Sequence, residues 1–203
     1  MDCDLLEENI LSDNFVLEPI LPIHAALLFD SLQSAELYTY IPFEPPVSVG
    51  FLEEKYKRWS ARRSSNGHEL RLNYAIFNPK LQKYLGTIQA TIEINGKTYI
   101  AYEVFPSYWR RGIGREAVSV LVAHLFDKFN IDVITAHLDT KNTRSIKLLE
   151  SLGFKCLAIL KDADHFKGRA SDEYIYELCK DKGEPSVAQE NAAAASPLIL
   201  NQI

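Results

Sequence analysis

Alternating hydrophobic and polar positions predict three consecutive strands in the first half of the chain. These runs cover residues 70–77, 84–94 and 97–105, and each is rich in β-branched and aromatic residues. The turn at 95–96 between the second and third runs is Asn-Gly, the dipeptide that most strongly favours a tight hairpin. A shorter strand over 14–19 precedes them. We therefore expect a largely antiparallel set of strands.

Helical spacing of apolar residues precedes these three strands. Residues 22–34 and 36–40 predict two short helices that end at a proline-rich segment. Ser48 is suited to cap a third helix, which is expected to end near 64–67. This helical part lies between the first strand and the second, and we expect the helices to pack on the faces of the sheet.

The second half of the chain alternates helices and strands. A helix is expected after Gly114, then a buried strand over 131–138, and then a helix over 142–152 that Gly153 closes in a left-handed conformation. Two more strands follow, at 154–160 and 172–178. This order predicts an α/β (α+β) domain with a mixed, mostly antiparallel sheet of about six to seven strands flanked by helices. A doubly wound parallel fold fits it less well.

A length of 203 residues corresponds to one domain. Residues 1–13 resemble a flexible leader, and 14–180 form the expected domain. Residues 181–203 lose periodicity and gain small and polar residues, so they are interpreted as a disordered tail.

Composition narrows the function classes. Twenty-seven acidic and 22 basic residues give a net charge of -5, which argues against non-specific nucleic-acid binding. Neither a signal peptide nor an 18-residue apolar run is present, so we expect no membrane partner. Three widely spaced cysteines favour a reducing, cytoplasmic location. The five histidines lack ligand spacing, so no metal is predicted.

The segment 104–116 carries the clearest chemical signal. A strand enters a turn that contains Gly112 and Gly114, and a helix begins directly afterwards. Glycines let backbone amides approach a ligand, and the first turn of a helix offers free amides and a positive dipole end to an anion. Neighbouring arginines strengthen this field. The simpler alternative is an ordinary turn with solvated arginines.

Two common phosphate motifs are excluded for this segment. The pattern GxxxxGK[ST] does not occur, and GxGxxG fails because residue 117 is alanine. The looser GxGxxA form is present, but it lacks the acidic residue expected at the end of a following strand. An ATPase or a dinucleotide-binding protein is therefore a less favoured interpretation of this segment.

The run WRRGIG at 109–114 resembles the [QR]xxGx[GA] pyrophosphate motif of GCN5-related N-acetyltransferases (GNAT). Trp109 departs from the usual Gln or Arg, but the PxxW arrangement at 106–109 is typical of the RimJ/RimL-type branch, which includes ribosomal-protein alanine N-acetyltransferases. Residues 142–154 are similar to the family's NxxSxxxLExLGF helix. Two motifs in the right order are far more specific than one.

The resemblance implies a sheet splayed open around acetyl-CoA, which is the cosubstrate, without a metal. One side of this cleft would hold pantetheine on a strand backbone and the pyrophosphate at the glycine turn. The other side would be lined by the helix that starts after residue 142. The coenzyme-binding residues that it implies are Val104, Phe105, Arg110, Arg111, Gly112, Ile113, Gly114, Arg115, Asn142 and Ser145.

Glu103 is the candidate general base. In the family, acetyl passes directly from the thioester to a neutral amine within a ternary complex, and this requires a group that removes the amine's proton. Glu103 is the carboxylate nearest the predicted cleft, and burial among apolar strand residues would raise its pKa. Because strand faces alternate, Glu103 could instead face solvent or pair with an arginine. Asn142 has a similar alternative, as the N-cap of its helix.

The general acid of the family is missing at its usual position. Many relatives carry a tyrosine seven residues after the asparagine, and here that residue is Leu149. A thiol with a pKa near ~8.5 leaves as a thiolate without much help. Ser145 or water is the candidate to take over the role.

The expected function is acetyl-CoA-dependent transfer of acetyl to a primary amine. The acceptor would be a protein N-terminus, such as a ribosomal-protein alanine, or a small molecule, and its pocket would be edged by 43–44 and 162–171. A monomer or homodimer is expected. A non-catalytic coenzyme A-binding or sensing module is the alternative. A weaker third possibility is a ribosome-associated or nucleic-acid adaptor that uses the arginines at 58, 62, 63, 110, 111 and 115.

Overall fold

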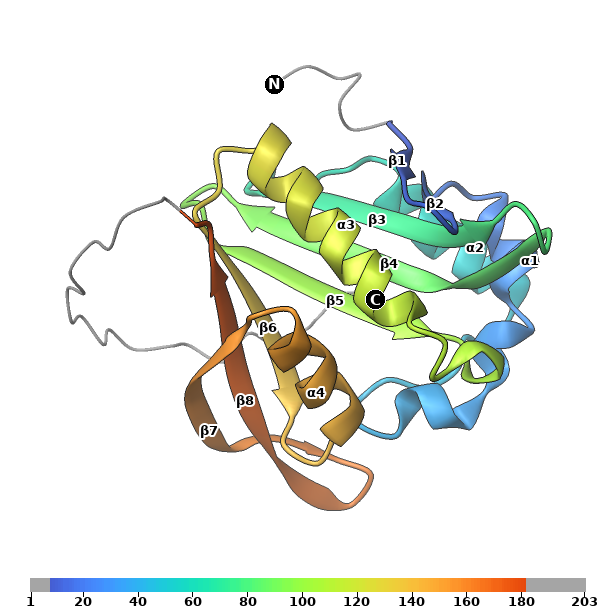
Figure 1. Cartoon of the computed structure of the whole chain (residues 1–203). Helices are drawn as coiled ribbons and strands as arrows, with labels where there is room; N and C mark the ends of the chain where they lie inside the picture. Colours follow the sequence, from blue (N-terminus) through green and yellow to red (C-terminus); the bar gives the residue numbers. More distant parts are fainter. Residues whose placement is uncertain (1–7, 182–203) are drawn as a thin grey trace.

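The computed structural model describes residues 8–181, which form one open sheet with helices on both faces (Figure 1). The sheet has the strand order β1-β2-β3-β4-β5-β6-β8-β7. All neighbouring strands are antiparallel except β5 and β6. The strands are β1 (Ile10–Leu11), β2 (Val16–Pro19), β3 (Glu69–Asn78), β4 (Lys83–Glu93), β5 (Thr98–Val104), β6 (Val133–Asp139), β7 (Lys155–Phe166) and β8 (Arg169–Cys179).

Within the described residues, four α-helices cover the sheet, two on each face. Helices α3 and α4 pack on one face through the larger hydrophobic core, and α1 and α2 pack on the other through a second core (Figure 1). Short 3-10 helices connect these elements. The helices are α1 (His24–Leu28), η2 (Ser31–Gln33), η3 (Ala35–Tyr38), α2 (Val49–Trp59), η4 (Pro106–Tyr108), α3 (Ile113–Lys128) and α4 (Thr143–Ser151).

The predicted fold class is confirmed: the sheet is mixed and mostly antiparallel. Its strand count is eight in the described residues rather than six to seven, because the sheet begins at Ile10, before the expected start at residue 14. The helix expected at 36–40 is instead the 3-10 helix η3, since only one turn fits before the prolines. The predicted leader and tail lie mostly outside the described residues, and the domain division stays a prediction.

The predicted helix cap and the predicted turn glycines have the expected local structure. Ser48 caps α2 by accepting a hydrogen bond from the Phe51 amide at 3.1 Å. Gly96 in the hairpin turn and Gly153 after α4 have φ angles of 86° and 87°, a left-handed backbone that glycine adopts without strain. These residues therefore determine where the helices and the hairpin begin or end.

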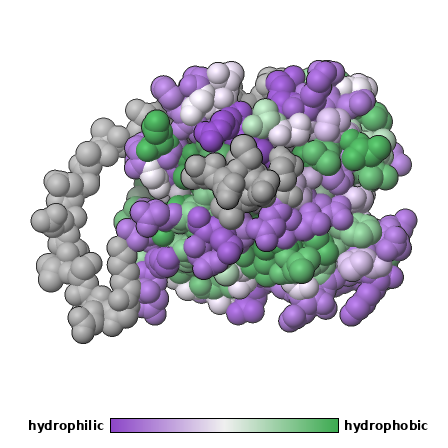
Figure 2. Space-filling view, turned by 90° about the horizontal axis from the view of Figure 1, so that it is seen from above, coloured by the Kyte–Doolittle hydropathy of each residue, from purple (hydrophilic) through white to green (hydrophobic). Residues whose placement is uncertain are grey.

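The surface mixes residue types. Figure 2 shows hydrophilic residues over most of the face that it draws, with smaller hydrophobic groups between them. Exposed apolar side chains such as Ile94 and Leu157 are normal on a folded domain. No helix within residues 8–181 is long and apolar enough to cross a membrane.

The sheet opens between β5 and β6. On one side, β5 pairs with β4 along its whole length, from Thr98 to Val104. On the other side, its parallel pairing with β6 is confined to Tyr99 opposite Thr135. The two strands then diverge toward the carboxyl end of β5, as Figure 1 shows. The splayed sheet that the resemblance implies is therefore present.

Gly86 on β4 lets β4 and β5 pair closely beside this opening. A Cβ atom on Gly86 would lie 2.1 Å from the Glu103 carbonyl oxygen, which is impossible without moving β5. We expect Gly86→Ala to lower the free energy of unfolding by about 1–3 kcal/mol, measured by urea denaturation. Gly50→Ala in α2 is the control, because nothing lies within 4 Å of its added Cβ. Equal stability of the two variants would contradict this role of Gly86.

Candidate active site

A cleft of about 430 Å³ lies where β5 and β6 diverge. Its walls come from the end of β5, the turn before α3 with the first turn of that helix, one side of α4 and the η3 segment. The structure therefore joins segments that are far apart in the sequence. The predicted site residues that line it are Glu103, Val104, Arg110, Gly112, Ile113, Gly114, Arg115, Asn142 and Ser145.

Two predicted residues do not line this cleft. Phe105 is 2% exposed and packs in the core with α1 and α2, and its amide donates to the Leu85 carbonyl at 2.8 Å. Arg111 is exposed, with its guanidinium 5.7 Å from the ring centre of Tyr108. Their coenzyme-binding roles therefore stay predictions without a cleft contact in this structure.

The turn before α3 offers backbone groups to an anion. Gly112 is the N-cap residue of α3 with φ 78°, and no side chain caps the helix there. Nothing lies within 4 Å of the position that a Cβ would occupy on Gly112. Amides at an uncapped helix start remain free to bind a ligand. With Arg110 and Arg115 in the same wall, this turn is suited to bind a phosphate group.

Gly114 brings the two helices that flank the cleft together. A Cβ on this residue would lie 2.9 Å from Leu148 of α4 and 3.5 Å from Val104 of β5. The absence of a side chain thus lets the first turn of α3 approach both elements closely. This contact sets the width of the cleft at its anion-binding end.

Trp109 connects three parts of the site. Its indole Nε1 donates to the Val104 carbonyl at 2.6 Å, and the guanidinium of Arg144 lies 3.8 Å from its ring centre. This distance is typical of a cation–π contact. The tryptophan therefore joins the glycine turn to β5 and to α4, and Arg144 brings a positive charge to the position where the family motif usually has Gln or Arg.

Asn142 caps α4 and also lines the cleft. Its side-chain oxygen accepts a hydrogen bond from the Ser145 amide at 3.3 Å, so the N-cap alternative is correct. Asn142 also lines the cleft, so its contact with a ligand stays a prediction. Ser145 lies one turn further along the same helix.

Glu103 lines the cleft, which is one of the two orientations that the sequence leaves open, and its role as a base stays a prediction. Its Oε1 accepts a hydrogen bond from the Thr87 hydroxyl at 2.9 Å. Burial raises the pKa of Glu103, while the Thr87 hydrogen bond and the charge of Lys55 oppose this increase. A carboxylate with a raised pKa in a cleft has the property required of a general base.

The α2 helix supplies neighbours of Glu103 that no sequence motif indicates. Burial lowers the pKa of Lys55, whose ammonium lies 4.7 Å from the ring centre of Trp59. The negative charge of Glu103 adds to burial in raising the pKa of Tyr56 and Tyr38. Only the packing of α2 and η3 near β5 brings these groups to the carboxylate. From the η3 segment, Glu36, Leu37 and Tyr40 also line the cleft.

The two segments expected to edge the acceptor pocket meet in the structure. Lys167, in the β7–β8 turn, donates to the Tyr38 carbonyl and lies 3.8 Å from the Glu44 carboxylate. Arg169 donates to the Thr39 carbonyl at 3.2 Å. The β7–β8 hairpin therefore packs against the η3 segment. The role of residues 43–44 and 162–171 in acceptor binding stays a prediction.

The arginines of the adaptor hypothesis do not form one surface. Arg62 is 3% exposed and donates to the Asn73 carbonyl at 3.2 Å, so it cannot contact a nucleic-acid phosphate. Arg110 and Arg115 belong to the cleft. The structure therefore weakens that hypothesis.

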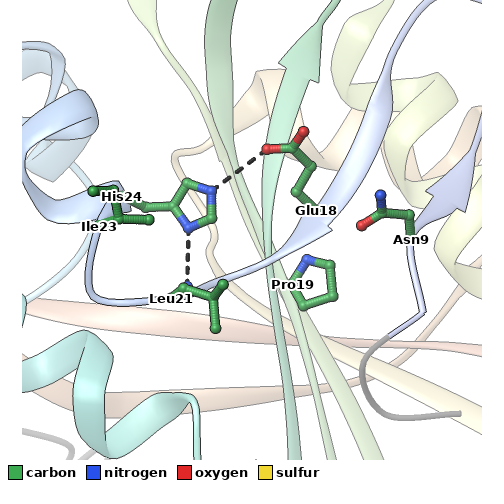
Figure 3. Close-up of a pocket in the computed structure, with 6 residues that line it drawn as sticks. All are labelled: Asn9, Glu18, Pro19, Leu21, Ile23 and His24. Carbon is green, nitrogen blue, oxygen red and sulfur yellow. Dashed lines mark hydrogen bonds and ion pairs between the residues drawn. The ribbon is translucent and has the colours of Figure 1, made fainter. Parts of the chain in front are cut away.

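A second cavity, of about 280 Å³, lies between β2 and the start of α1 (Figure 3). His24 accepts a hydrogen bond from the Leu21 amide at 2.9 Å, and its other ring nitrogen lies 3.4 Å from Glu18. The Tyr84 hydroxyl donates to the same carboxylate at 3.0 Å. These contacts join α1 to the sheet, and none of the predicted site residues lines this cavity.

Comparison with known proteins identifies the family. Residues 14–155 match the model of the acetyltransferase (GNAT) domain. An uncharacterized N-acetyltransferase, p20, of Bacillus licheniformis is 38% identical over 86 residues, which are 42% of this chain and 48% of that protein. The uncharacterized N-acetyltransferase YoaA of Bacillus subtilis is 23% identical over 171 residues, which are 83% of this chain and 95% of that protein.

A solved structure shares the fold. RimL, a ribosomal L7/L12 alpha-N-protein acetyltransferase in complex with coenzyme A, superposes with a TM-score of 0.76 at 20% identity, over 86% of this chain and 99% of that chain. The family match covers more than half of the chain, so this protein belongs to the GNAT acetyltransferases, a family of N-acetyltransferase enzymes. The predicted family is confirmed.

Proposed function

We propose that this protein transfers the acetyl group of acetyl-CoA to a primary amine in the cleft between β5 and β6. The observation that carries the proposal is that one cleft contains both an anion-binding turn and a carboxylate with a raised pKa. The family match and the coenzyme A complex of RimL support the same cosubstrate.

The coenzyme would lie along the cleft, with its ends bound by different elements. Arg110, Arg115 and the amides after Gly112 would bind the pyrophosphate, and Asn142 would contact the coenzyme from α4. The pantetheine arm would then follow β5 past Val104 and bring the thioester to Glu103. The chain order supports this arrangement, because β5 runs from Glu103 through Val104 to the turn before α3.

Glu103 would act as the base that makes the amine a nucleophile. It accepts a proton from the amine, and the nitrogen attacks the carbonyl carbon of the thioester. The carbon–nitrogen bond forms, the carbon–sulfur bond breaks, and the sulfur leaves with the electron pair as a thiolate. Because a thiolate is a fair leaving group, the chemistry requires modest assistance at the sulfur.

The acceptor class is a primary amine, either a protein N-terminus or a small molecule. RimL is described as an acetyltransferase of the α-amino group of a ribosomal protein, and the carboxylate of Glu36 in the cleft would favour a cationic amine over an anionic substrate. A cytoplasmic location and a monomeric or homodimeric state complete the proposal. The alternative, a coenzyme A sensor without turnover, predicts binding without acetyl transfer.

The test is a screen for release of the coenzyme A thiol. The protein would be mixed with acetyl-CoA and with N-terminal peptides, polyamines or aminoglycosides, and the free thiol would be measured with a chromogenic reagent. Amine-dependent thiol release together with an acetylated product in mass spectrometry supports the proposal. Tight acetyl-CoA binding without turnover on any of these amines favours the sensor.

Turnover should also depend on pH in a defined direction. Glu103 accepts a proton only when it is ionised, and burial raises its pKa above the ordinary value of 4.5. We therefore expect kcat to fall as the pH decreases through this raised pKa. The pH at which half of kcat is lost should lie above 4.5. A kcat profile that stays flat down to the ordinary pKa of a glutamate would contradict the role of Glu103.

A further inference from the structure

Tyr102 is a cleft residue to which no motif assigns a role. It precedes Glu103 on β5 and lines the same cleft. Its side chain packs against the core under α3 and α4, whereas Phe105 packs in the core under α1 and α2. Because side chains alternate along a strand, Tyr102 and Glu103 reach the cleft from opposite faces of the sheet.

The Tyr102 hydroxyl meets Ser145 from the facing wall. This hydroxyl is buried, and no hydrogen bond of normal geometry joins it to another described residue. Burial raises the pKa of Tyr102 to about 12, and its interaction with the Ser145 side chain opposes that increase. Two hydroxyl groups carry two protons, and a hydrogen bond between them uses only one. At least one donor therefore remains for a ligand in the cleft.

Tyr102 and Ser145 lie on the opposite side of β5 from Glu103, and therefore on the opposite side of the reacting carbon in the proposed complex. The incoming amine must lie near Glu103, on the α1–α2 side of β5. When the thioester carbon becomes tetrahedral, the leaving sulfur and the attacking nitrogen point in different directions from it. Groups on opposite sides of β5 can therefore contact one of these atoms each. Tyr102 and Ser145 lie on the α3–α4 side. The residue one turn beyond Ser145 on α4, Leu149, is 1% exposed in the core and supplies no donor.

We infer that the Tyr102 and Ser145 hydroxyls together donate a hydrogen bond to the coenzyme sulfur as its bond to the acetyl carbon breaks. This inference rests on the proposed acetyl transfer and adds Tyr102 as a catalytic residue. The sulfur takes the electron pair of the broken bond, and the proton of the amine goes to Glu103. The phenol keeps its own proton, since its pKa lies far above that of a thiol.

The two hydroxyls should also affect the ionisation of coenzyme A in the product complex. A donor aimed at the sulfur stabilises the thiolate form of bound coenzyme A more than the thiol form. The bound thiol should therefore have a lower pKa than the free thiol, which titrates near ~8.5 as cysteine does. Replacing Tyr102 with phenylalanine removes one of the two donors and keeps the ring that packs against the core.

The experiment is a pH titration of the coenzyme A complex, followed by the ultraviolet absorbance of the thiolate as a difference from the protein alone. We expect Tyr102→Phe to raise the pKa of the bound thiol by about one unit, a tenfold change in the ionisation constant. Ser145→Ala should raise it as well, because each single variant leaves one of the two hydroxyl donors, and the Tyr102→Phe/Ser145→Ala double variant should raise it further. The control, Tyr99→Phe, makes the same change on the same strand at a residue that is not in the cleft lining.

Coenzyme A affinity and thermal unfolding of each variant show whether the fold and the binding site are intact. An unchanged thiol pKa in a Tyr102→Phe variant that is folded and binds coenzyme A would overturn the inference and leave the acetyltransferase proposal standing. Failure of the folded wild-type protein to bind coenzyme A would overturn both. A shift as large in Tyr99→Phe would also contradict the inference, since the effect would then be general to the strand.

Discussion

Glu103→Gln should lower kcat about 100- to 10,000-fold, the usual contribution of a positioned general base. Glutamine has nearly the same shape, and its side-chain oxygen can still accept the hydrogen bond from Thr87. It cannot accept the amine proton. Acetyl-CoA affinity should stay within about twofold of wild type, because the base contacts the acceptor rather than the coenzyme. Steady-state thiol release and calorimetry measure the two quantities separately.

Glu93→Gln is the matched control for this substitution. Glu93 ends β4 at the hairpin and does not line the cleft, so its kcat should equal that of wild type. A Glu103→Gln variant that retains half of the wild-type turnover would rule out Glu103 as the base. An equal loss of acetyl-CoA affinity and turnover would mean that the substitution damages the cleft instead.

Gly112→Asp should weaken acetyl-CoA binding at least about a hundredfold. The substitution adds a carboxylate at the position proposed for the pyrophosphate, and opposing a like charge costs several kcal/mol. Space for the new side chain is available, because nothing lies within 4 Å of its Cβ. The loss of affinity should therefore come from charge rather than from collapse of the fold. Calorimetric titration with acetyl-CoA measures it.

Backbone strain is the competing explanation, and Gly67→Asp controls for it. Gly67 has φ 72°, close to the 78° of Gly112, and its Cβ position is equally open. It lies in the turn before β3, outside the cleft. We expect the two variants to lose similar stability and only Gly112→Asp to lose affinity. Similar affinity losses in both would contradict the anion site.

Periodicity predicts most elements of the sheet because their apolar residues face one of the two hydrophobic cores. The strands at β3, β4 and β5, and the helices α3 and α4, lie within a few residues of their expected bounds. The pattern was weaker for β1, which has only two residues, and for η3, which is a single turn. Such short elements depend on tertiary contacts, since they bury too little apolar surface to show a period.

Site residues within motifs could be predicted, and those positioned by packing could not. Gly112 and Asn142 carry local signals, because a turn and a helix cap each require particular residue types. Lys55 comes to Glu103 only through the packing of α2 under the sheet, which no local pattern records. The sequence does not indicate a role for Tyr102, because an alternating strand pattern does not show which face of the strand meets the cleft.

The most direct test of the account is a calorimetric titration of the wild-type protein with acetyl-CoA. Every step proposed for the cleft, including the roles of Glu103 and Tyr102, requires the coenzyme to bind at the turn before α3. We expect saturable binding at one site per chain, with a dissociation constant in the range of about 1 to 100 micromolar. Absence of binding by the folded protein would contradict it.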